Sequence, residues 1–108
     1  MTTAAVEAEV RGEVVCIRIS GEIDLANAAR VQDQINSSIT NDVRTVLIDL
    51  TGLDYLDSAG LRVLFTLADR LRVLQMNLDL VVPRGSPVRK AVELSGLAPV
   101  ARLRSTMD

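Results

Sequence analysis

Residues 46–61 read VLIDLTGLDYLDSAGL, and this stretch decides how the chain folds. The apolar run 46–50 predicts a strand buried on at least one face, and Thr51-Gly52 breaks that run. Asp57 and Ser58 then begin an amphipathic helix, so Ser58 displays a hydroxyl at a helix N-terminus. That position suits either a plain helix cap or a reversible phosphate.

The rest of the chain alternates strands and helices around this stretch. The spacing of apolar residues predicts helices over about 25–39, 58–74 and 87–95, with Asp24 as the start signal of the first. Strands are expected at 5–11, 14–19, 46–50 and 78–82, with a short edge strand at 100–103. This order predicts an α/β fold, a mixed sheet of four to five strands covered by helices.

Composition excludes several classes of function. The 108 residues suit a single domain, 1–108, with its core at about 5–103, and leave no room for a second. A net charge of -2 and dispersed basic residues argue against nucleic-acid binding. Cys16 is the only cysteine, so no internal disulfide forms and a cytoplasmic location is expected. No stretch reaches the ~20 apolar residues of a membrane helix, so no membrane association is expected.

The residues needed for catalysis are missing. The chain has no histidine, which removes the base of a serine triad and the commonest metal ligand. Lys90, the only lysine, is the single remaining base for Ser58 and lies on a different predicted helix. We therefore expect no catalytic residue, no metal and no cofactor, and a protein that is not an enzyme.

Four aspartates near strand-to-helix junctions leave one other kind of site to consider. Asp24, Asp49, Asp54 and Asp57 could converge at one sheet edge as a magnesium-binding phosphoacceptor pocket. Such a pocket needs an acidic pair after the first strand and a lysine after a late strand, and neither is present. Helix caps and solvated loop acids are the simpler interpretation.

Four segments together resemble a known family. SGEID at 20–24, VLIDL at 46–50, LDSAGL at 56–61 and LSGL at 94–97 match, in order and spacing, the STAS-domain anti-sigma factor antagonists of bacteria. The resemblance covers roughly residues 13–103, and its most specific element is Asp-Ser-x-Gly-Leu after a strand. It implies a single STAS-like domain whose helices pack mainly on one side of the sheet.

The resemblance also implies a function. Family antagonists bind an anti-sigma factor that is also a serine kinase, and so release a sigma factor for transcription by partner switching. The kinase phosphorylates the serine that corresponds to Ser58, and a serine phosphatase reverses the modification. The alternative is a STAS module that acts as a scaffold or regulatory subunit in a stress-signalling complex or a transporter system.

Position along the chain suggests which residues form the switch and contact the partner. Most of these residues lie just before or at the start of the two helices, and two lie one and two turns into the second helix. Each of them is either a contact with the partner or an ordinary solvated position. The set comprises the phosphorylation site Ser58 with Asp24, Asn27, Asp57, Ala59, Gly60, Arg62 and Thr66. A phosphate on Ser58 adds about -1.5 to -2 charges beside Asp57, so local electrostatics would suffice for switching.

Overall fold

Six strands and three helices follow one another along residues 3–107, the part of the chain that the computed structural model describes. Residues 1, 2 and 108 of the predicted domain lie outside this part. The elements are β1 (Ala4–Arg11), β2 (Val14–Ile23), α1 (Ala28–Ser37), β3 (Thr45–Asp49), β4 (Leu53–Leu56), α2 (Ser58–Val73), β5 (Asn77–Val81), α3 (Pro87–Leu94) and β6 (Arg102–Arg104).

All six strands join one mixed sheet. The order is β1-β2-β3-β5-β6, in which β1 and β2 form an antiparallel hairpin and the other neighbours run parallel. β2 is long enough to pair twice, with β3 through 14–18 and with β4 through 21–23. The register shifts between Gly21 and Glu22, where β2 passes from one partner to the next.

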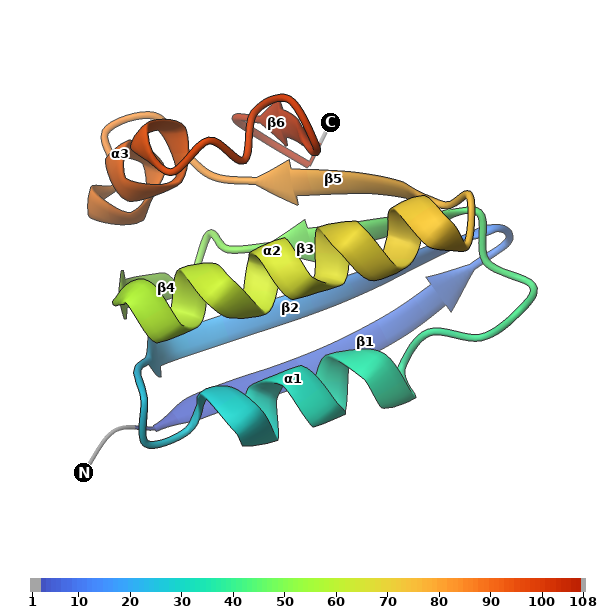
Figure 1. Ribbon diagram of the computed structural model, residues 1–108, viewed down its shortest axis with the longest axis horizontal. Coiled ribbons are helices and arrows are strands. Elements are labelled where there is room, and N and C mark those ends of the chain that lie inside the picture. The colour runs from blue at the N-terminus through green and yellow to red at the C-terminus, as the bar shows by residue number, and fades with distance from the viewer. Residues whose placement is uncertain (1–2, 108) are drawn as a thin grey trace.

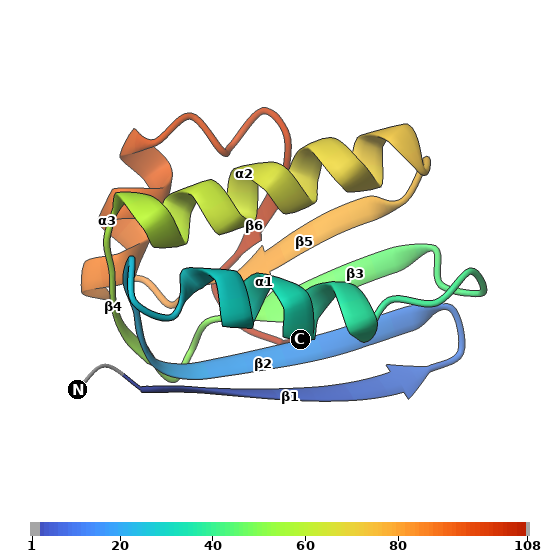
Figure 2. The same ribbon diagram turned by 60° about the horizontal axis from the view of Figure 1, so that its bottom comes forward.

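The helices confirm the predicted layering. α1 and α2 lie side by side on one face of the sheet, and α3 lies beyond its end, next to β4 (Figures 1 and 2). Alternate residues of the central strands point into this layer and are fully buried, as are the apolar residues of the helices that face them. The core residues with the least exposure include Val15, Ile17, Ile19, Val31, Val46, Ile48 and Leu80.

Several details of the sequence prediction were wrong. The second strand continues to Ile23, four residues past its predicted end at Ile19. The sheet has six strands instead of four to five, because Leu53–Leu56 pairs with the end of β2 as β4. The first helix begins at Ala28, three residues after its predicted start at Leu25. Leu25 is consequently 83% exposed and lies outside the predicted apolar stripe. The last strand begins at Arg102, after a turn through residues 98–100.

Charged residues occupy the face of the sheet that α1 and α2 leave uncovered. Arg18 on β2 lies opposite Asp49 on β3, and its Nε is 3.5 Å from Oδ2 of that carboxylate. Arg104 and Asp79 make a similar pair at 3.6 Å between β6 and β5. The Asp49 side chain is only 6% exposed, so this carboxylate is buried against the sheet and is not accessible at the carboxyl edge of the strands.

Cys16 lies on the same face, and its chemistry can be tested. Burial raises the pKa of the Cys16 thiol, and the negative charge of Asp49 raises it further. Because the folded pKa exceeds the unfolded one, the stability that this thiol contributes is complete at low pH. It is lost as pH rises through the folded pKa. Iodoacetamide should therefore alkylate Cys16 at a higher pH in the folded protein than in urea, and an equal or lower pH midpoint would contradict this.

Candidate functional site

The switch residues predicted from the sequence gather at one end of the sheet. The carboxyl end of β2, strand β4 and the N-termini of α1 and α2 all lie there (Figure 1). The backbone N–H of Asp57 donates to the carbonyl of Ile23 at 3.2 Å. This bond joins the start of α2 to the end of β2, so the two helix N-termini are held by the same strand.

Asp57 is the residue that caps α2. Its Oδ1 accepts hydrogen bonds from the backbone N–H groups of Ala59 at 2.8 Å and Gly60 at 3.2 Å. The sequence left a plain cap and a phosphate site as alternative roles for Ser58, and the geometry gives the cap to Asp57. Ser58 is the first residue of α2 and is exposed, and its Oγ makes no hydrogen bond within residues 3–107.

Gly60 lets the first turn of α2 sit directly on the sheet. A Cβ at this position would lie 2.9 Å from Cβ of Leu56 and 3.3 Å from Cβ of Ile23, so a side chain here would push the helix outward. Ala59 is half-buried and packs against the core. These two residues therefore fix where Ser58 is displayed and are not themselves exposed for contact with a partner.

The loop between β2 and α1 is held by its own side chains. Asp24 Oδ1 accepts from the N–H of Ala26 at 2.9 Å, while the Asp24 N–H donates to Oδ1 of Asn27 at 3.0 Å. Asn27 Nδ2 donates to the carbonyl of Glu22 at 2.9 Å. Because Asn27 is only 6% exposed, it positions this loop and offers little surface to a partner.

Replacing Asn27 by alanine should lower the free energy of unfolding by about 1–3 kcal/mol. The change removes both side-chain hydrogen bonds and leaves the Glu22 carbonyl and the Asp24 N–H without those partners. Urea unfolding measures the loss. Asn41→Ala is the matched control, since Asn41 is exposed and its side chain makes no hydrogen bond within residues 3–107. Equal losses for the two variants would contradict the positioning role.

Exposed side chains surround Ser58. Arg62 and Thr66 follow it at helical spacing along the outer face of α2, and both are exposed. Leu25, 83% exposed in the α1 loop, and Tyr55, 51% exposed on β4, add apolar surface at the same end of the molecule. Neither residue could be assigned to the site from the sequence, because the apolar spacing placed Leu25 inside a helix and Tyr55 fell between predicted elements.

The four aspartates of the alternative reading do not converge. Asp49 lies on the helix-free face, where it also accepts from the N–H of Thr51 at 3.0 Å, and Asp57 is engaged as a cap. Asp54 is exposed on β4. Among residues 3–107 no group of three or more acidic or cysteine side chains is arranged to hold a metal ion.

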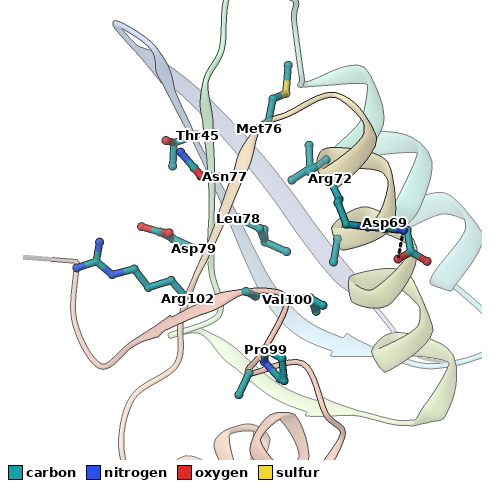
Figure 3. A pocket seen from close by; sticks show the side chains of 14 residues that line it. Thr45, Asp69, Arg72, Met76, Asn77, Leu78, Asp79, Pro99, Val100 and Arg102 are labelled. Atoms are coloured by element: carbon teal, nitrogen blue, oxygen red, sulfur yellow. Dashed lines mark ion pairs between the residues drawn. The ribbon is translucent and has the colours of Figure 1, made fainter.

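A second concave region lies at the other end of α2. An open cleft of about 750 Å³ runs between the last turns of α2, the start of β5 and residues 98–102 (Figure 3). Its rim carries both charges, and Arg72 pairs with Asp69 at 3.9 Å. None of the switch residues predicted from the sequence lines this cleft.

No helix within residues 3–107 has the length and apolar character needed to cross a bilayer.

Known proteins resemble this chain in sequence and in fold. The STAS domain family model matches residues 5–108. The anti-sigma-F factor antagonist RsfB of Mycobacterium tuberculosis is 34% identical over 94 residues, which cover 87% of this chain and 75% of that protein.

Solved structures agree with these matches. A crystal structure of an anti-sigma factor antagonist from Mycobacterium paratuberculosis has a TM-score of 0.86 at 24% identity, covering 98% of this chain and 89% of that one. The Bacillus cell fate determinant SpoIIAA in its phosphorylated form has a TM-score of 0.66 at 26% identity, covering 92% and 90%. With the family model matching nearly the whole chain, this protein belongs to the STAS domain family.

Proposed function

We propose that this chain is an anti-sigma factor antagonist. It binds an anti-sigma factor in the bacterial cytoplasm, and the sigma factor that was held there is released for transcription. The identity to a named antagonist of this kind, 34% over 87% of the chain, supports the assignment. The protein acts by binding and is not an enzyme, in keeping with its lack of histidine.

The switch is phosphorylation of Ser58 by the anti-sigma factor, which is also a serine kinase. Oγ of Ser58 attacks the γ-phosphorus of ATP bound to the kinase, ADP leaves, and the hydroxyl proton passes to a base of the kinase. A serine phosphatase later hydrolyses the ester. The observation that carries this proposal is the exposed Ser58 hydroxyl, free of intramolecular hydrogen bonds within residues 3–107, on a helix turn that Asp57 caps.

The docking surface surrounds that hydroxyl. Arg62 and Thr66 contribute from α2, and Asp24 contributes from the α1 loop. Leu25 and Tyr55 supply the exposed apolar area that such interfaces bury at their centre. Asp57, Gly60, Ala59 and Asn27 act indirectly by holding the two helix starts in place.

Incubation with anti-sigma kinases and ATP tests the proposal. Mass spectrometry should find one added phosphate on the wild-type protein, located on Ser58, and none on Ser58→Ala. Size-exclusion chromatography should show that both unphosphorylated proteins form the complex and that Ser58→Asp forms less of it. Phosphate on another residue, or a Ser58→Asp complex as tight as that of the wild type, would overturn the mechanism.

A further inference from the structure

Two backbone N–H groups that could bind a phosphate on Ser58 are already occupied by Asp57. Helix N-termini ordinarily bind phosphate through their free N–H groups. Here the N–H groups of Ala59 and Gly60 already donate to Oδ1 of Asp57. The same carboxylate repels a phosphate, so a side-chain cation next to Ser58 would stabilise the modified residue.

Arg62 is placed to supply that cation. It stands four residues after Ser58 on α2, the spacing at which two helical side chains meet with Cβ atoms about 5–6 Å apart. Helical side chains lean toward the N-terminus, so a side chain at position 62 can reach the turn that carries Ser58. An anion at the first position and a cation at the fifth is also the favourable orientation of such a pair.

Nothing in the described chain competes for this arginine. Within residues 3–107 no ion pair or side-chain hydrogen bond involves Arg62, which is exposed. Its helical neighbours at three and four residues are Ala59, Phe65 and Thr66 besides Ser58, and none is acidic. By contrast, Arg72 on the same helix pairs with Asp69. No other basic residue occurs between positions 45 and 69.

We infer that Arg62 binds the phosphate of phospho-Ser58 within the same molecule, through charge-assisted hydrogen bonds from its guanidinium. This inference rests on the proposed modification of Ser58 and adds its regulatory consequence. Once held by the phosphate, Arg62 is no longer available to the anti-sigma factor. Phosphorylation therefore places negative charge in the interface and removes a cationic contact from it in one step.

A titration of the phosphate tests the pair without any kinase. Phosphoserine is incorporated at position 58 during synthesis of the full chain, and its phosphorus resonance is followed with pH by NMR. A neighbouring guanidinium favours the dianion, whose formation ordinarily centres near pH 6. The midpoint should lie about 0.3 of a pH unit lower in the wild type than in Arg62→Gln.

Matched variants separate this pair from other charges near Ser58. Asp24, Asp54, Asp57, Tyr55 and the helix dipole act on the phosphate in every variant alike. Arg70→Gln, which removes a charge from the same helix two turns beyond Arg62, should titrate like the wild type. Arg62→Lys should restore part of the difference. Lys90→Gln tests the one lysine, on α3, and should also titrate like the wild type.

Three outcomes would overturn the inference. These are equal midpoints for wild type and Arg62→Gln, an equal change in Arg70→Gln, or a larger change in Lys90→Gln. Because the phosphate is installed during synthesis, the titration reads the pair even if no kinase modifies Ser58. Failure of the kinase assay and failure of the pair are therefore distinguishable.

Discussion

Gly21→Ala should lower the free energy of unfolding by about 3 kcal/mol. Gly21 has φ +93°, a conformation that residues with a Cβ rarely adopt, and an added Cβ would clash with the carbonyl oxygen of Thr3. That carbonyl accepts the N–H of Glu22 at 2.9 Å. The substitution therefore strains the bend of β2. It also pushes Thr3, which precedes β1, away from that bend.

Gly96→Ala is the control that isolates the clash. Gly96 has φ +90°, close to that of Gly21, but no atom lies within 4 Å of the position its Cβ would take. It should cost only the backbone term, about 1–2 kcal/mol. Urea unfolding of the two variants gives the difference directly. Equal losses would show that the approach of Thr3 to Gly21 contributes nothing to stability.

Phosphorylation of Ser58 should weaken binding to the anti-sigma factor roughly a hundredfold or more, because placing a dianion in the interface and withdrawing Arg62 from the partner together cost several kcal/mol. Ser58→Asp carries one charge and should weaken binding by about tenfold. Isothermal titration calorimetry with the anti-sigma factor measures both. The fold should survive, since Asp57 keeps the cap and the Ser58 side chain makes no hydrogen bond within residues 3–107.

Two variants decide whether the effect is local. Ser58→Ala should bind like the wild type, because it removes only an exposed hydroxyl. Thr40→Asp adds the same single charge in the exposed loop between α1 and β3, at the other end of the molecule (Figure 1). It should leave affinity unchanged. A loss equal to that of Ser58→Asp would mean that net charge, and not the position of Ser58, controls binding.

The sequence predicted the strands and helices whose apolar residues follow a regular period. The buried run that became β3 and the three-and-four spacing of α2 were identified within a residue of their ends. β4 was missed because Leu53-Asp-Tyr-Leu is short, and only its pairing with the bend of β2 makes it a strand. The start of α1 was misplaced because Leu25 is apolar yet lies in a loop that Asn27 holds.

By itself, the sequence determined the α/β order, the absence of histidine chemistry and the position of Ser58 at the start of a helix, because these depend on residue type and local spacing. Only the tertiary structure decided that Asp57 takes the cap, that Asn27 is buried and that Asp49 faces away from the site. Those roles depend on where each side chain points and on how the strands and helices pack around it. Composition and periodicity specify neither of these.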